Sequence, residues 1–231
     1  MGCKKFFLKN QQKTNRNTNS SNNKIVYLTF DDGPSENTEK ILDILLEYDI
    51  KGTFFVNGNH TEFGRRIYKR IVNEGHAIGN HTYSHSYQTI YSSVENYLAD
   101  TLRLEKLIYE TTGIKPSIIR FPGGSNNLVS RRYSEKALMK ELATTLTEMG
   151  YQYFDWNIDS KDSSSTTPPK ENIIKAVLSV IGDKRGAIIL FHDSLHKTTT
   201  VEALGPIIET LRYMGYEFQP LSEDAFCVQF Q

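Results

Sequence analysis

Short apolar runs alternate along the chain with longer segments in which apolar residues recur at helical spacing. The first run, from Ile25 to Phe30, is continuous, as expected for a strand that is covered on both faces. Six more runs follow, near 53–56, 76–79, 117–121, 151–157, 186–192 and 216–220. The pattern predicts about seven strand–helix units.

Two of the intervening helices have predictable ends. One helix begins after Ser35, a favourable N-cap residue, and carries apolar residues such as Ile41 and Leu45 on one face. A later helix spans about 93–112 and ends before Gly113.

Alternation of strands and helices predicts an α/β fold with a parallel sheet. Seven units without a glycine-rich phosphate loop favour a barrel over a dinucleotide-binding sheet. In both arrangements ligands bind at the carboxyl ends of the strands, so polar residues at those ends are candidates for chemistry.

The chain divides into a polar leader and one folded domain. Residues 9–23 contain no apolar side chain to offset the entropy cost of ordering, so we expect 1–23 to be a disordered tether. The 231-residue chain is 38% apolar, which suits one core, and we expect 24–231 to form one catalytic domain. The apolar residues at 6–8 are too few for a signal peptide, which needs about 7–15.

Composition excludes several classes of function. The 27 lysine and arginine residues balance 27 aspartate and glutamate residues, so we expect no nucleic-acid partner. Two cysteines are too few for a disulfide framework or a cysteine zinc site, so a metal would need histidine and carboxylate ligands. No run approaches the roughly 20 apolar residues of a membrane span.

Asp31 and Asp32 end the first predicted strand, directly before Gly33 and Pro34. Aspartate before glycine and proline is ordinary turn chemistry, so the pair by itself has a structural interpretation. Successive side chains of an extended strand point in different directions. One carboxylate can therefore bind a metal while the other acts as a base.

His81 and His85 follow the predicted strand near 76–79 and are four residues apart. On a helical turn this spacing puts both imidazoles on one side. With one aspartate from the first strand end they supply three ligands and leave a position for water, as in catalytic zinc sites. A metal held in this way suits hydrolysis of an amide or an ester.

Three further segments end apolar runs: Arg120-Phe121-Pro122-Gly123-Gly124, Asp159-Ser160-Lys161-Asp162 and Leu190-Phe191-His192. In chain order, TFDDG, HTYSH, RFPGG, DSKD and LFH resemble the five motifs of the polysaccharide deacetylases, the NodB-homology members of carbohydrate esterase family 4. The resemblance covers residues 24–222. It implies a distorted (β/α)7 barrel with parallel strands, the NodB-homology fold.

The resemblance also implies a metal-dependent deacetylase with one divalent ion, usually zinc, with cobalt or another divalent ion as the alternative. Asp32, His81 and His85 match the metal ligands of that family. Asp31 matches its general base and His192 its general acid.

Four more positions take their expected roles from the same resemblance. Arg120 matches the arginine that orients the base, and Asp162 matches the carboxylate that tunes the acid histidine. The main-chain N–H of Gly123 matches an oxyanion donor, and Leu190 matches the residue that lines the pocket for the acetyl methyl group.

Some positions depart from the family pattern and affect substrate recognition more than chemistry. Ser163 stands where relatives carry tryptophan in the fourth motif, and Gly123 and Gly124 stand where many carry an aromatic residue. Trp156 is the only tryptophan and is expected to be core or a pocket wall. Tyr83, inside the second motif, is expected to line the substrate groove.

Two carboxylates keep more than one interpretation. Asp155 and Asp193 could each pair with Arg120 or His192, or could be strand-end carboxylates without a special role. Three histidines without a spaced partner are interpreted as structural: His60, His76 and His196.

These features predict an N-deacetylase that acts on N-acetylglucosamine units of peptidoglycan or of a chitin-like oligomer. An O-acetyl esterase acting on acetylxylan is an alternative, because esters and amides need the same catalytic groups. An inactive carbohydrate-binding relative is another, although a binder needs neither base nor acid. We expect a monomer that binds an amino-sugar polysaccharide outside the cell or at the cell wall, with no signal peptide visible.

Overall fold

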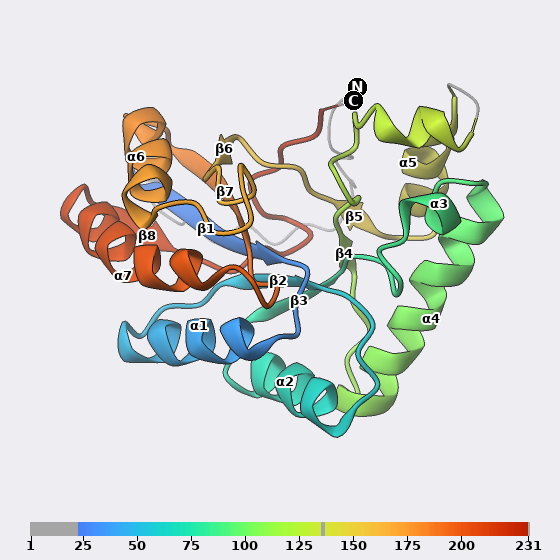
Figure 1. The fold of residues 1–231 in the computed structure, drawn as a ribbon, viewed down its shortest axis with the longest axis horizontal. Coiled ribbons are helices and arrows are strands. Elements are labelled where there is room, and N and C mark those ends of the chain that lie inside the picture. Colours follow the sequence, from blue (N-terminus) through green and yellow to red (C-terminus); the bar gives the residue numbers. More distant parts are fainter. Residues whose placement is uncertain (1–22, 135–136, 231) are drawn as a thin grey trace, which may run out of the picture.

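The protein, seen here as a computed structural model, is described over residues 23–134 and 137–230 (Figure 1). The predicted tether at 1–23 lies outside the described residues apart from Asn23. None of the helices described in these two ranges is long and apolar enough to cross a membrane.

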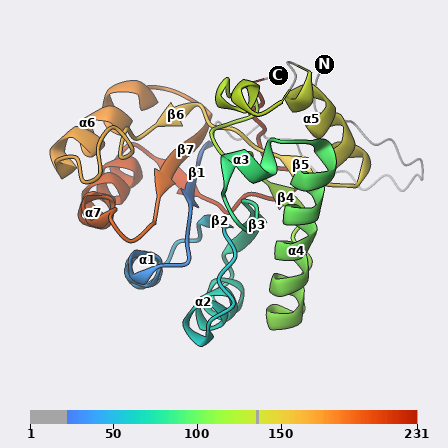
Figure 2. The same cartoon turned by 45° about the vertical axis from the view of Figure 1, so that its right-hand side comes forward.

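Seven parallel strands form a curled half-barrel in the order β5-β4-β3-β2-β1-β7-β6 (Figures 1 and 2). Their bounds are β1 (Lys24–Asp31), β2 (Thr53–Val56), β3 (Ala77–Asn80), β4 (Ile118–Ile119), β5 (Gln152–Tyr153), β6 (Ile158–Asp159) and β7 (Gly186–His192). This architecture confirms the predicted distorted barrel with parallel strands.

The strand list differs from the prediction in two places. The predicted run at 216–220 is β8 (Tyr216–Phe218), which pairs with the amino half of β1 and lies off the main path of the sheet. The short strand β6 was missed, because its two residues follow the polar Asn157 and make no apolar run. The seventh strand of the curl is therefore β6, and β8 is an addition to it.

Helices surround the curled sheet on its outer side (Figure 2). They are α1 (Glu36–Glu47), α2 (Glu62–Asn73), α3 (Tyr87–Ile90), α4 (Val94–Thr112), α5 (Leu138–Glu148), α6 (Lys170–Ile181) and α7 (Thr198–Tyr213), with the 3-10 helix η1 (Val129–Arg132). The predicted ends are confirmed. Ser35 caps α1 by accepting from the Asn37 N–H, and Gly113 ends α4 in the left-handed conformation.

Side chains alternate between the two faces of β1. Leu28 and Phe30 pack in the core beneath the helices, where the Phe30 ring stacks on Phe54 at 5.1 Å. Tyr27 faces the inside of the curl and packs in a separate core with Phe55. Asp31 lies four residues after Tyr27, so strand alternation puts its carboxylate inside the curl, at the carboxyl end of the sheet.

Candidate metal centre and active site

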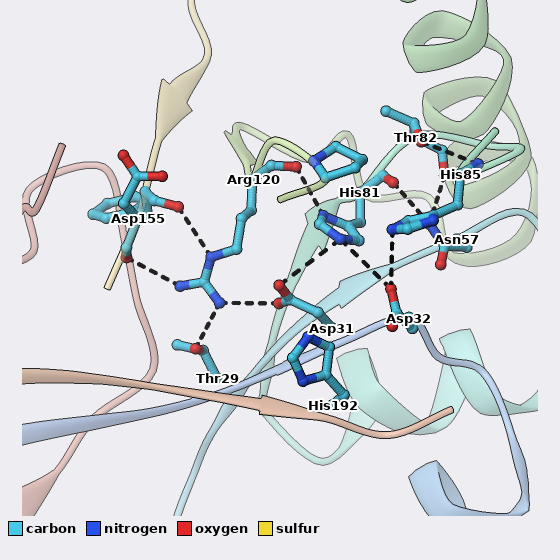
Figure 3. A network of polar contacts seen from close by, with 12 residues as sticks. Thr29, Asp31, Asp32, Asn57, His81, Thr82, His85, Arg120, Asp155 and His192 are labelled. Carbon is cyan, nitrogen blue, oxygen red and sulfur yellow. Dashed lines mark hydrogen bonds and ion pairs between the residues drawn. The ribbon is translucent and has the colours of Figure 1, made fainter. Parts of the chain in front are cut away.

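Three predicted metal ligands come together at the carboxyl ends of β1 and β3 (Figure 3). Asp32 Oδ1 lies 3.3 Å from His85 Nε2 and 3.6 Å from His81 Nε2, and the ligand atoms all lie within 4.8 Å of one another. Asp32 has a φ of 83°, an uncommon conformation for aspartate. Asp31 Oδ2 lies 3.8 Å from the same His81 Nε2, so both carboxylates approach one imidazole.

The two histidines do not lie on a helical turn, so the predicted geometry of this motif is wrong. Residues 81–86 form a bent loop in which Thr82 and His85 both have positive φ, at 67° and 50°. Asn57 supports the loop by donating from Nδ2 to the carbonyls of His81 and Thr82. The loop still places the two imidazole centroids 5.2 Å apart.

Hydrogen bonding fixes the orientation and protonation of His81 in this cluster. His81 Nδ1 lies 2.8 Å from the Arg120 carbonyl, which can only accept, so Nδ1 carries the proton and the Nε2 lone pair faces Asp32. Burial, helped by the nearby His85, lowers the pKa of His81 to about 3 and keeps the ring neutral. Asp32 Oδ1 is buried without a hydrogen-bond partner among the described residues. An orphaned carboxylate oxygen facing imidazole nitrogens fits a divalent metal site.

Asp31 lies beside the cluster and pairs with a fully buried arginine. Arg120 Nη1 donates to Asp31 Oδ1 at 2.9 Å and to Thr29 Oγ1 at 2.7 Å. Arg120 also donates through Nε to the Phe154 carbonyl and through Nη2 to the Asp155 carbonyl. These bonds hold the guanidinium in one orientation. Burial raises the pKa of Asp31 above its usual range although Arg120 opposes the shift, which makes the carboxylate a stronger base.

His192 ends β7 directly opposite Asp31 and pairs with Asp162. Its Nδ1 lies 2.7 Å from Asp162 Oδ1, and its main-chain N–H donates to Asp162 Oδ2 at 2.7 Å. Thr200 of α7, which sequence reasoning missed because no motif marks it, donates to the same Oδ2 at 2.9 Å. Each carboxylate oxygen of Asp162 therefore has a donor.

The contact between Asp162 and His192 strongly changes the pKa values of both side chains. Burial acts to lower the pKa of His192, but the hydrogen bond and charge of Asp162, with the charges of Asp32 and Asp31, raise it to about 9. Burial acts in turn to raise the pKa of Asp162, but the hydrogen bonds and charge of His192, together with the hydrogen bond from Thr200, outweigh it, so that pKa is lowered. The imidazole is therefore held protonated at neutral pH.

Gly123 and Leu190 lie where small or apolar groups are needed. Gly123 has a φ of 79°, and a Cβ there would lie 2.6 Å from the Tyr87 hydroxyl, so only glycine fits. Its main-chain N–H has no acceptor among residues 23–134 and 137–230. Leu190 is 5% exposed in β7 and pairs in register with Thr29. Tyr87, two residues after the second motif, was missed by the sequence analysis.

The two predicted aromatic wall residues lie in different places. The Tyr83 ring packs on the guanidinium of Arg103 at 3.6 Å, and its hydroxyl lies 3.2 Å from His60 Nδ1. Trp156 is half-buried, with its ring 5.7 Å from the guanidinium carbon of Arg120 and 5.1 Å from the Phe230 ring. Trp156 therefore borders the buried arginine, whereas Tyr83 packs against groups that lie outside the cluster.

Asp155 and Asp193, the two carboxylates with more than one interpretation, have other partners. Neither pairs with Arg120 or His192 through its side chain. The Asp155 carboxylate accepts from the Ser125 N–H, the Ser125 hydroxyl and the Phe230 N–H. The Asp193 carboxylate accepts from the Thr38 hydroxyl at 2.6 Å, and burial raises its pKa to about 7. Both carboxylates connect segments that are distant in the sequence.

A parallel α/β half-barrel with an Asp–His–His cluster at its strand ends defines a class of protein in which a cluster that fits a divalent metal site lies beside buried acidic and basic groups. The chain belongs to the polysaccharide deacetylase family, whose model matches residues 18–142. The family resemblance seen in the five motifs is thereby confirmed.

Individual relatives match over most of the chain. A peptidoglycan-N-acetylglucosamine deacetylase of Bacillus cereus is 34% identical over 207 residues, covering 88% of this chain and 89% of that protein. The catalytic domain of a peptidoglycan N-acetylglucosamine deacetylase from Eubacterium rectale has a TM-score of 0.86 at 35% identity, covering 90% of this chain and 93% of that one. A bifunctional xylanase/deacetylase of Pseudobutyrivibrio xylanivorans is 33% identical over 212 residues, which cover 90% of this chain and 32% of that protein.

Proposed function

We propose that this protein removes N-acetyl groups from N-acetylglucosamine units of peptidoglycan by metal-dependent hydrolysis. The observation that carries the proposal is the orphaned Asp32 Oδ1, which faces His81 and His85 and is flanked by Asp31 and His192. The names of the Bacillus and Eubacterium relatives support peptidoglycan as the substrate.

Asp32, His81 and His85 would hold the cation, and their nitrogen and oxygen donors suit zinc, with cobalt or another divalent ion as the alternative. When bound, such an ion acidifies a water molecule and polarises the carbonyl of the acetyl group. Asp31 accepts the proton that the attacking water loses, since its pKa is raised and Arg120 fixes its orientation. The Gly123 N–H donates to the carbonyl oxygen as negative charge develops on it.

His192 donates the second proton. An amine leaves readily only when its nitrogen is protonated, and Asp162 keeps the imidazole charged and fixes which nitrogen faces the site. The products are acetate and a glucosamine unit with a free amine. Leu190, buried in β7 opposite Thr29, is the residue proposed to contact the acetyl methyl group.

Acetate release tests the function directly. Purified protein would be incubated with peptidoglycan fragments, chitin oligomers and acetylxylan, each with a chelator, without one, and with zinc restored after chelation. We expect metal-dependent release from the amino-sugar substrates. No acetate from any substrate in the presence of zinc would leave only the inactive carbohydrate-binding alternative.

O-deacetylation of acetylxylan is the second candidate function. It is favoured by the relative whose name joins a xylanase to a deacetylase, and an ester needs the same base, acid and oxyanion donor as an amide. Faster acetate release from acetylxylan than from peptidoglycan fragments would establish it in place of the first.

We also propose that the protein acts at the cell wall or outside the cell, because that is where a peptidoglycan substrate lies. We propose further that it acts as a monomer. Separation of the wall, membrane and cytoplasmic fractions of the native host, followed by immunodetection, tests the location. Light scattering of the purified protein tests the monomer.

A further inference from the structure

An aromatic pair that joins two distant parts of the chain lies at the carboxyl end of β5. The Phe230 and Trp156 rings meet edge to face, with centroids 5.1 Å apart and an interplanar angle of 81°. Phe230 belongs to the segment 219–230 that follows β8 and has no helix or strand. It keeps 38% of its surface exposed although its main chain is held in place.

A buried carboxylate anchors this segment. The Asp155 N–H donates to the Val228 carbonyl at 2.9 Å, and the Phe230 N–H donates to Asp155 Oδ2 at 2.8 Å. The other oxygen of the same carboxylate accepts from the Ser125 N–H at 2.8 Å. Asp155 is fully buried, so the three segments that meet on it hold one another in a defined arrangement.

The anchored ring borders the reacting centre. A Cβ on Gly124 would lie 3.1 Å from the Trp156 ring and 3.4 Å from the Phe230 ring, so both rings pack on this glycine. Gly124 directly follows Gly123, the proposed oxyanion donor. Trp156 also lies over Arg120, which orients the proposed base. A polymer whose acetyl group reaches Gly123 would therefore come close to Phe230, which packs on the next residue.

We propose that Phe230 contacts a sugar ring next to the one that is deacetylated. This inference rests on the proposed function. The carbon–hydrogen face of a pyranose is apolar and flat, and an exposed aromatic ring with a fixed main chain offers a matching surface at little cost in conformational entropy. Ser163 leaves the fourth motif without an aromatic residue, so an exposed aromatic ring elsewhere near Gly123 gains importance for substrate contact.

Steady-state kinetics on chitin oligomers of increasing length test the proposal, with wild type, Phe230→Leu and Phe230→Trp. Leucine keeps apolar packing on Trp156 but lacks the aromatic face. We expect F230L to raise KM for the longer oligomers by about fivefold to tenfold, with a smaller change in kcat and for the disaccharide, and F230W to restore KM.

Phe226→Ala is the matched control, because Phe226 belongs to the same segment and is 44% exposed, but packs on Gly186 at the start of β7. It should keep the wild-type KM, and thermal unfolding of every variant should confirm that each is folded. An unchanged KM in F230L, or equal changes in kcat and KM at every oligomer length, would overturn the inference. Failure of the proposed function is distinct, since wild type itself would then release no acetate.

Discussion

Two charged regions lie at the carboxyl ends of the strands, and their carboxylate oxygens differ in how many hydrogen bonds they accept. In the Asp162–His192 pair, both carboxylate oxygens accept hydrogen bonds, and Thr200 adds another donor. In the Asp32–His81–His85 cluster, the buried Asp32 Oδ1 faces two imidazole nitrogens and has no hydrogen-bond donor among the described residues.

The difference separates a pair whose hydrogen bonds are complete within the described residues from a cluster that leaves a buried carboxylate oxygen without a donor. A carboxylate with a donor on each oxygen keeps its geometry by itself, and here it holds a proton on His192. The Nε2 lone pair of His81 repels the Asp32 oxygen until a proton or a cation lies between them. Removal of the cation should therefore affect the Asp32–His81–His85 cluster strongly and the Asp162–His192 pair weakly.

The largest effect is expected when the cluster loses a ligand. His81→Ala should lose the bound ion and reduce turnover by roughly a thousandfold or more, because the ion supplies several kcal/mol of stabilisation in the transition state. Metal content by elemental analysis and acetate release by assay measure the two losses. His196→Ala, at an exposed histidine, should change neither. Retention of a full equivalent of metal by H81A would show that His81 is not a ligand.

Asp31→Asn should distinguish the role of a general base from that of a metal ligand. The amide keeps the shape of the side chain but has no charge to accept a proton, so turnover should fall by roughly 10²–10⁴ while the metal stays bound. Asp183→Asn, at a side chain that is 99% exposed, is the control and should behave as wild type. Loss of metal from D31N along with turnover would place Asp31 among the ligands instead.

Asp162→Asn should move the alkaline limb of the pH profile. Protonated His192 is the active form, so activity falls as pH rises through its pKa, which is about 9 without a cation and lower once nearby positive charge is added. Loss of the Asp162 charge lowers that pKa further and shifts the limb to lower pH by about one unit or more. The profile of kcat/KM measures the shift.

Asp159→Asn is the control for this shift. Asp159 lies in the same segment but pairs with the exposed Lys161, so its loss should leave the limb in place. An alkaline limb that stays at the wild-type pH in D162N would exclude His192 as the acid.

The smallest effect is expected at Thr200, which borders the Asp162–His192 pair. Thr200→Val removes one of the donors to Asp162 Oδ2 but leaves the His192 N–H, so the free energy of unfolding should fall by about 1 kcal/mol. Chemical denaturation measures the change, and Thr198→Val, exposed in the first turn of α7, should change it less. Equal losses in the two variants would mean that the buried hydrogen bond contributes nothing.

Much of the fold could be predicted because it depends on local patterns. Apolar periodicity predicted six of the seven strands of the curl, and cap residues at Ser35 and Gly113 predicted helix ends. β6 was missed since two residues are too short for a periodic signal. The histidine spacing was right that His81 and His85 come together with Asp32 but wrong about the helical turn, because the spacing does not reveal the left-handed backbone at Thr82 and His85.

The sequence by itself determined which chemical groups stand at the strand ends: two carboxylates, two imidazoles, an arginine and a third histidine, each in a recognisable motif. Only the tertiary structure decided their partners. The Asp155 carboxylate accepts from Ser125 and Phe230, whereas only its main-chain carbonyl accepts from Arg120. Thr200 reaches Asp162 from a helix that is distant in the sequence. Such contacts depend on how strands and helices pack in space, and local patterns of polarity carry no information about which distant donor meets which acceptor.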